Sequence, residues 1–113
     1  MGKPRLKRGD LIKAVLPGEY GKPRPCLVIQ SDRLVNLDSV ILCPLTSDLA
    51  TDGPTRFAVQ PGGAGGLMME SLIMVDKVTA VSRSRCREHI GRLDAVIMQQ
   101  IDARLAFVTG LMD

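Results

Sequence analysis

Aromatic residues are scarce in this chain of 113 residues, which has no tryptophan, one tyrosine and two phenylalanines. A nucleic-acid surface built on stacked aromatic side chains is therefore not expected. Long apolar runs are missing too, since no stretch approaches the roughly 18 residues of a membrane span. No apolar segment of the signal-peptide kind follows the basic N-terminus MGKPRLKRGD. These absences predict a cytoplasmic chain with no membrane segment.

Potential metal ligands are also few, because the chain has one histidine, His89, and three cysteines that form no CxxC motif. This set argues against a zinc site, and we expect no metal and no cofactor. A catalytic mechanism that needs two histidines is excluded. Cys26 and Cys43 lie inside apolar runs, which favours buried free thiols in a reducing compartment.

The length and the composition, 45% hydrophobic and 24% charged, predict one globular domain. We expect a basic N-terminal arm over residues 1–7 and a single domain over residues 8–113. The net charge of +3 is uneven: residues 1–30 hold seven basic and two acidic side chains, and residues 77–92 hold five and one. Two positive segments can form a phosphate-binding face or can be solvated loops, and charge alone leaves both open.

Short runs rich in Val, Ile and Leu, bounded by Pro, Gly, Asn and Asp, predict strands rather than helices. The apolar spacing after Asp94 changes to that of a helix, which Asp94 can cap at its start and Gly110 at its end. The fold class is mainly β (α+β): a small, strongly bent barrel of five to seven strands with a C-terminal helix. The expected strands cover residues 11–16, 26–29, 40–45, 56–60, 72–75, 78–81 and 88–92. The glycine-rich segment 61–66 is expected to be a mobile loop without regular structure, and a bent strand or a bulge is expected at Asp76.

Two polar side chains flank the strands at 26–29 and 40–45. Arg24 lies between Pro23 and Pro25 just before the first strand, and Thr46 follows the second. If the strands are antiparallel, Arg24 and Thr46 meet at one edge of the sheet. Asp76 interrupts the buried stretch 67–81 and must be paired, solvated or functional. Taken alone, each of these three residues also has a simple structural explanation.

Five motifs occur in an order that resembles the PemK/MazF-like toxins of bacterial toxin–antitoxin pairs. They are RGD at residue 8, RPCLVIQSD at 24, CPLTS at 43, ESLIMVDKVTAVSRSR at 70 and IGRLD at 90. Together they extend from about Arg8 to Leu111. The resemblance implies an SH3-like barrel with a C-terminal helix, similar in fold to the gyrase-poisoning CcdB toxins.

The resemblance also implies a metal-independent, sequence-specific endoribonuclease that cleaves single-stranded mRNA, forms a homodimer and is held inactive by a cognate antitoxin. On the family's motifs, the catalytic positions fall on Arg24, Thr46 and Asp76. The RNA contacts are expected at Lys22, Ser47, Arg56, Lys77, Arg83 and Arg85. Arg83, Arg85 and Arg87 alternate, so they would share one face of an extended stretch. Cleavage without a metal is expected to use the 2′-OH of the substrate, with a proton acceptor, a donor to the leaving oxygen and positive charge on the phosphate.

This sequence departs from the pattern at two places. Many members have Gln and Arg where it has Lys77 and Thr79, which leaves the RNA contacts there and the target sequence open. Some members use a residue of the first loop, where the polar candidates are Glu19, Tyr20 and Lys22. Two alternatives remain: a non-catalytic CcdB-like poison of gyrase, or an inactive SH3-like binding module. The first depends on an aromatic C-terminus, whereas this chain ends in GLMD.

Overall fold

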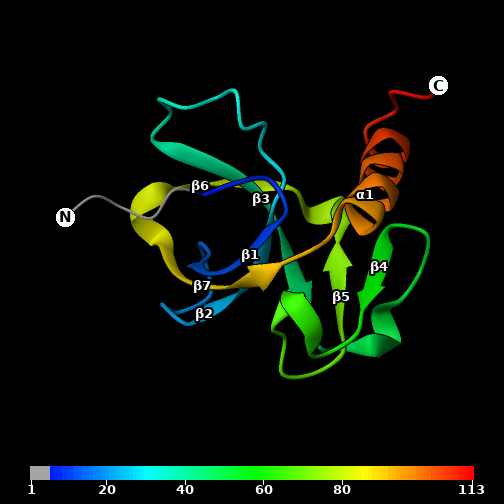
Figure 1. Cartoon of the computed structure of the whole chain (residues 1–113), viewed down its shortest axis with the longest axis horizontal. Coiled ribbons are helices and arrows are strands. Elements are labelled where there is room, and N and C mark those ends of the chain that lie inside the picture. The colour runs from blue at the N-terminus through cyan, green and yellow to red at the C-terminus, as the bar shows by residue number, and fades with distance from the viewer. Residues whose placement is uncertain (1–5) are drawn as a thin grey trace.

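The computed structural model describes residues 6–113, which form an antiparallel sheet of seven strands and one C-terminal helix (Figure 1). The predicted mainly β fold with a C-terminal helix is confirmed, and residues 1–5 of the expected basic arm lie outside the described residues. No helix in this part of the chain is long and apolar enough to cross a membrane. The strands are β1 (Asp10–Val15), β2 (Pro23–Val28), β3 (Ser39–Thr46), β4 (Arg56–Val59), β5 (Ser71–Met74), β6 (Thr79–Ser82) and β7 (Cys86–Arg92), and the helix is α1 (Ala95–Val108).

Strand β3 belongs to two parts of the sheet, and this bends the sheet toward a barrel. Its first half pairs with β6 and its last residues pair with β5, while β2 pairs with its middle. The order β4-β5-β3-β2-β1-β7 therefore runs through β3, with β6 beside its first half. The strands described here do not close into a full barrel, because no ladder joins β6 to β7.

Two apolar clusters lie on opposite faces of the central strands. Leu11 and Leu27 face a cluster that includes Ile101 of α1, whereas Ile12 and Val28 face a second cluster inside the curved sheet. Neighbouring residues of a strand point to opposite faces, so both faces of β1 and β2 are buried. This explains why consecutive residues are apolar at Leu11 and Ile12 of β1 and at residues 26–28 of β2.

Helix α1 covers one side of the sheet, next to β4 and β5 (Figure 1). The Asp94 carboxylate accepts a hydrogen bond from the Ile97 amide at 2.9 Å, which is the predicted N-cap. Gly110 takes a left-handed φ of 78° after the last turn, as expected for a C-terminal glycine. The predicted apolar face packs on the core, with Ile101 fully buried and Ile97, Leu105 and Val108 half-buried. An ion pair between Arg8 and Asp102 joins the segment before β1 to the helix.

Three local predictions were wrong. Segment 61–66 has regular structure: a 3₁₀ turn at Gly63–Gly65 lies inside a bridge between Gly62 and Leu67. Asp76 lies in a 3₁₀ turn, Val75–Lys77, between β5 and β6, rather than in a bent strand or a β-bulge. The residues Arg83–Arg85 form another 3₁₀ turn, so the alternating arginines are not an extended stretch with one shared face. In each case hydrogen bonds or core packing override a pattern that looked extended or irregular.

Gly66 joins the segment before β5 to the edge of β7. Its φ is 71°, and a Cβ atom placed on it would lie 2.4 Å from the carbonyl oxygen of Ile90. Both the left-handed backbone and the close approach require glycine here.

We therefore expect Gly66→Ala to lower the free energy of unfolding by about 1–3 kcal/mol, measured by urea denaturation. Gly53→Ala is the matched control, because a Cβ there meets no atom within 4 Å and its φ is ordinary. Equal effects of the two substitutions would contradict the role given to the Gly66 contact.

Candidate active site

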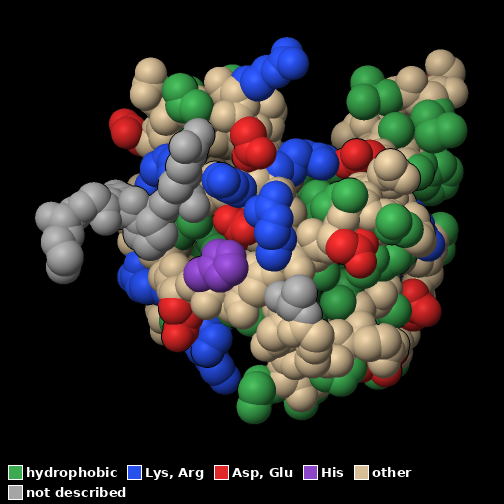
Figure 2. Space-filling view, viewed as in Figure 1, with side chains coloured by type: hydrophobic (Ala, Val, Ile, Leu, Met, Phe, Trp, Pro, Cys, Tyr) green, Lys and Arg blue, Asp and Glu red, His purple; other side chains and the backbone are tan. Residues whose placement is uncertain are grey.

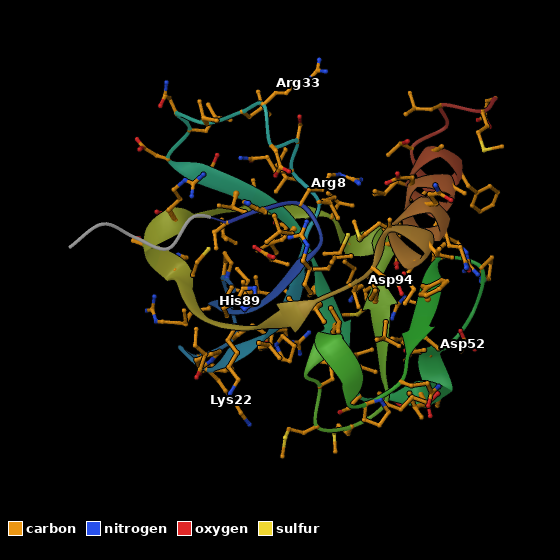
Figure 3. The ribbon with its side chains drawn as sticks, viewed as in Figure 1. Arg8, Lys22, Arg33, Asp52, His89 and Asp94 are labelled. Atoms are coloured by element: carbon orange, nitrogen blue, oxygen red, sulfur yellow. The ribbon has the colours of Figure 1, made fainter. Side chains whose placement is uncertain are left out.

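A groove of about 590 Å³ opens between the edge formed by β1, β2 and β7 and the segment that precedes β5. Arg24 and Thr46 both line it, together with Lys22 and Ser47. The single histidine, His89, lies on the β7 wall of the groove, and Figure 3 shows it on the same side of the ribbon as Lys22. On the face seen in Figure 2, both basic and acidic side chains lie near this histidine, whereas apolar side chains are denser toward α1.

The strand register brings Arg24 and Thr46 together. Strands β2 and β3 are antiparallel, and their ladder ends at Cys26 opposite Pro44. Arg24 and Thr46 each lie two residues beyond this last pair, and both line the groove. The sequence predicted this meeting on the condition that the strands were antiparallel, and the structure fulfils that condition. Both side chains line one groove, in agreement with this prediction, and their catalytic roles remain predictions.

Arg24 is held by its neighbours and by one acid. It pairs with Ala14 of β1, and Pro23 and Pro25 fix the backbone on either side. Its Nη2 lies 3.4 Å from Oε1 of Glu19, and both side chains are about one-third exposed. The guanidinium is therefore neutralised by a carboxylate but stays within reach of the groove.

Glu19 reaches Arg24 because the loop between β1 and β2 turns back on itself. Gly18 and Gly21 have positive φ, as does Tyr20, and the Lys22 amide donates to the Glu19 carbonyl at 3.0 Å. From the sequence, Glu19 was only one of three polar candidates in this loop. Two glycines around an acid that precedes the Arg24 motif are the signal that could have singled it out.

The hydroxyl of Thr46 has a defined direction. Its oxygen accepts a hydrogen bond from the Asp48 amide at 3.1 Å, which is a local turn of the kind that threonine often makes. The half-buried side chain also lines the groove. Because the amide occupies a lone pair of the oxygen, the hydroxyl hydrogen can be donated to a ligand in the groove.

The β7 wall carries groups that sequence reasoning did not assign to the site. Glu88 forms an ion pair with Lys13 at 3.5 Å, and both line the groove. The Nε2 of His89 lies 3.3 Å from the buried carboxylate of Asp10, which Arg92 also contacts at 2.7 Å. The pairing of β7 with β1, which has two register shifts, places these side chains, and their distance in sequence from Arg24 hides the relation.

Asp76 lies outside the groove lining and is paired with Arg56. The Nε of Arg56 donates to its carboxylate at 2.8 Å, and Nη2 donates to the other oxygen at 3.4 Å. Partial burial raises the pKa of Asp76, but hydrogen bonds from Arg56, its own backbone amide and Thr55 outweigh this and leave the pKa below its usual value. The structure therefore does not bring Asp76 or Arg56 together with Arg24.

The other predicted RNA contacts are also away from this groove. Lys77 is exposed beside Asp76, and Arg85 is exposed in the turn before β7. The Nε of Arg83 donates to the Leu37 carbonyl at 2.8 Å, and this side chain lines a separate hollow of about 320 Å³ with Lys7 and Arg92. Their contact with RNA stays a prediction.

The cysteines are placed for packing. Cys26 and Cys43 are fully buried in the two apolar clusters, and burial raises the pKa of each thiol to about 12. Both remain protonated at neutral pH and are not nucleophiles there. Among residues 6–113, no group of three or more His, Cys, Asp or Glu side chains is arranged to hold a metal ion.

Comparison with known proteins identifies the family. Residues 7–109 match the family described as "PemK-like, MazF-like toxin of type II toxin-antitoxin system". The chain is 41% identical over 108 residues to a "Probable endoribonuclease MazF" of Mycolicibacterium smegmatis, covering 94% of this chain and 98% of that protein. It is 28% identical over 115 residues to "Endoribonuclease EndoA" of Bacillus subtilis, covering 96% and 97%. The chain therefore belongs to the PemK/MazF-like toxin family, and the predictions of this family and of its endoribonuclease class are confirmed.

Solved structures show the same fold. A mycobacterial endoribonuclease in complex with its cognate antitoxin superposes with a TM-score of 0.78 at 20% identity, over 94% of this chain and 96% of the other. A MazE–MazF structure from Deinococcus radiodurans superposes with a TM-score of 0.76 at 22% identity, over 95% and 98%. The open, barrel-like sheet with its C-terminal helix is therefore the fold of MazF-like toxins.

The Asp76–Arg56 pair predicts a pH dependence of stability. A carboxylate whose pKa is lowered by folding stabilises the protein above the unfolded value, about 3.9, and this stabilisation is lost as the pH falls through the folded pKa. The two side chains are 33% and 13% exposed, so we expect Asp76→Asn to lower the free energy of unfolding at pH 7 by only about 1 kcal/mol or less.

Thermal unfolding of parent and Asp76→Asn between pH 7 and pH 2 measures this, and the difference should vanish at the acid end. Asp52→Asn is the control. The Asp52 carboxylate accepts a local hydrogen bond from the Gly53 amide at 2.8 Å, and an asparagine oxygen can accept the same bond. A difference that is unchanged at low pH would show that the pair does not titrate as described.

Proposed function

We propose that this chain is the toxin of a toxin–antitoxin pair and cleaves single-stranded mRNA at specific sequences by attack of the substrate's own 2′-OH. The observation that carries the proposal is the groove that Arg24 and Thr46 line together. Membership of a family that includes named endoribonucleases supports it.

The proposed reaction transfers a phosphoryl group within the RNA. The 2′-oxygen forms a new bond to phosphorus as its proton leaves, the bond from phosphorus to the 5′-oxygen breaks, and that oxygen takes up a proton. The products are a 2′,3′-cyclic phosphate and a 5′-OH. The protein must supply a proton acceptor, a proton donor and positive charge at the pentavalent phosphate.

Arg24 is suited to the phosphate. Its planar guanidinium can donate two parallel hydrogen bonds to phosphate oxygens, and it is too basic to exchange protons near neutral pH. Thr46 can donate its hydroxyl hydrogen to a non-bridging oxygen while the Asp48 amide holds its own oxygen in place. We therefore assign transition-state stabilisation to both residues.

Two acids are candidates for the proton acceptor. Glu19 lies 3.4 Å from Arg24, so a phosphate bound by the guanidinium would lie near its carboxylate. Asp76, the acid expected from the family's motif, is bound by Arg56 outside the groove lining. This geometry favours Glu19, and Asp76 remains the alternative.

The proposal includes two protein partners and a location. Exposed apolar side chains such as Phe107, Leu111 and Met112 leave surface for a second copy, so we expect a homodimer. The two positive segments suit an acidic antitoxin that covers the groove.

The cytoplasm is the expected location because the proposed substrate is mRNA. Parts of the RNA beyond the groove are then expected to contact four basic side chains, those of Lys77, Arg83, Arg85 and Arg56.

A non-catalytic gyrase poison and an inactive binding module are the competing functions. Nothing in the groove favours either, because both leave the juxtaposed guanidinium and hydroxyl without a role. The gyrase poison also depends on an aromatic C-terminal end, and residues 110–113 are GLMD.

Purified protein incubated with mRNA in excess chelator tests the proposal. We expect cleavage at a recurring short sequence with 2′,3′-cyclic phosphate and 5′-OH ends, and inhibition by the cognate antitoxin. Light scattering of the same preparation is expected to give the mass of a dimer. Intact RNA together with stalled gyrase would instead identify the poison, and intact RNA alone the inactive module.

Substitutions at the groove test the roles of its side chains. Arg24→Ala should slow cleavage about 10²- to 10³-fold, the usual scale for loss of one transition-state donor, and Arg24→Lys should also be slow because it loses the planar fork. Thr46→Val should lose activity while Thr46→Ser keeps most of it. Glu19→Gln should slow cleavage more than Asp76→Asn does.

Single-turnover cleavage rates measure these effects, and circular dichroism checks that each variant is folded. A folded Arg24→Ala protein that cleaves at the parent rate would remove Arg24 from the mechanism. A larger effect of Asp76→Asn than of Glu19→Gln would move the proton acceptor to Asp76.

A further inference from the structure

Two exposed methionines line the same groove as Arg24. The Met68 side chain is 95% exposed and that of Met69 is 59% exposed, and both line the groove. They follow Leu67, which is buried and belongs to the core beneath α1. Adjacent apolar side chains left open to solvent beside a polar site are a common mark of a binding surface.

The backbone that presents these methionines is held at three points. The Gly62 amide donates to the Leu67 carbonyl at 2.9 Å, and Gly66 packs against the backbone of Ile90 in β7. The buried hydroxyl of Ser71 donates to the Met69 carbonyl at 3.1 Å. Met68 and Met69 are therefore displayed from a fixed segment, and we call this pair the methionine shelf.

The methionine shelf is continuous with the strand that carries Thr46. In the ladder between β3 and β5, Thr46 lies opposite Leu72, three residues beyond Met69. Lys22 and Arg24 line the same groove. One groove thus offers cationic and hydroxyl groups for an anion and a polarisable apolar surface beside them.

A ligand that uses both surfaces must carry an anionic group next to a flat apolar face. A single-stranded RNA does so at every nucleotide, because each phosphate adjoins an unstacked base. Proteins usually provide aromatic side chains for such bases, but this chain has only three aromatic residues. Thioether sulfur makes favourable contacts with aromatic rings and adapts to their shape, so methionine can take this place.

We infer that the methionine shelf is a nucleobase subsite, on which a base next to the scissile phosphate packs while that phosphate lies at Arg24 and Thr46. This inference rests on the proposed function and extends it to the residues that bind the base. The contact is with the face of the base rather than its edge, so it contributes affinity and position for any base at that nucleotide. Other groups of the protein must then discriminate among the four bases.

Binding of uncleavable RNA to parent and variant proteins tests the subsite. The cleavage site is first mapped with the parent, and the RNA is then made with a 2′-deoxy nucleotide there to prevent attack. A second RNA series replaces the base on either side of the scissile phosphate by an abasic nucleotide. Dissociation constants are measured for parent and for the Met68→Ala/Met69→Ala double variant with each RNA.

We expect removal of one flanking base to weaken binding to the parent by roughly tenfold. The double variant should bind the intact RNA about as weakly as the parent binds the abasic RNA. Replacing the intact RNA by the abasic RNA should then weaken binding to the double variant only slightly further. This loss of additivity identifies contact between the methionines and the base. Val96→Ala is the control, since Val96 is an apolar side chain 64% exposed on α1 and does not line the groove.

An abasic effect that is as large in the double variant as in the parent would overturn the inference. So would a double variant that loses affinity for the antitoxin while its RNA binding is unchanged, which would assign the methionine shelf to the protein partner. A parent that neither binds nor cleaves RNA would remove the proposed function and the subsite together. If the parent cleaves RNA but the effects of the methionine substitutions and of the missing base on binding are additive, only the subsite is contradicted. Thermal unfolding confirms that the double variant is folded.

Discussion

The antiparallel register between β2 and β3 is the constraint on which the candidate site depends. It brings Arg24 and Thr46 to the same groove, although 22 positions separate them in the sequence. A slip of one residue would turn every side chain of a strand to the other face and would bury one of these groups in the core. Such a slip is prevented because both faces of the central strands are packed, with Leu27 on one side and Cys26 on the other. Core packing therefore determines the geometry of the groove.

The groove carries cations whose charges are already compensated. Arg24 faces Glu19 and Lys13 faces Glu88, at 3.4 and 3.5 Å. A phosphate that binds Arg24 must compete with the Glu19 carboxylate. The Glu19 contact therefore holds the guanidinium in place in the free protein but lowers its affinity for a phosphate. These pairs are partly exposed and are weakened by salt, as are contacts between the protein and a nucleic-acid backbone. Added salt therefore weakens both the Arg24–Glu19 pair and the contact between Arg24 and a phosphate.

The loops around the groove are more ordered than their composition indicates. Glycines allow the turn that brings Glu19 back to Arg24 and the close approach of Gly66 to Ile90. Both loops carry exposed side chains, Tyr20 in the first and the methionine shelf in the second. A small fold of this kind can vary the residues on these loops without changing the strand register. The groove can therefore change its ligand contacts while the Arg24–Thr46 pair stays in place.

Most of the elements could be predicted from local signals. Short apolar runs bounded by turn residues identified the strands, and the spacing of Leu93, Ile97 and Ile101 identified the helix. The same reasoning failed where packing decides the conformation: at segment 61–66, at Asp76 and at Arg83–Arg85, which form 3₁₀ turns. The site was predicted in part, because Pro23 and Pro25 mark Arg24 and CPLTS marks Thr46 on their own strands.

The sequence by itself determined the strands, the capped helix and the two polar positions at the strand ends, because propensity, turn chemistry and periodicity act between near neighbours. Only the tertiary structure decided which charges meet. It paired Glu19 with Arg24 and Arg56 with Asp76, and it put His89 and the methionine shelf on the walls of the groove. These contacts depend on how the sheet bends at β3 and on where its loops return. That bend results from packing both faces of the sheet at once, which no local pattern in the chain encodes.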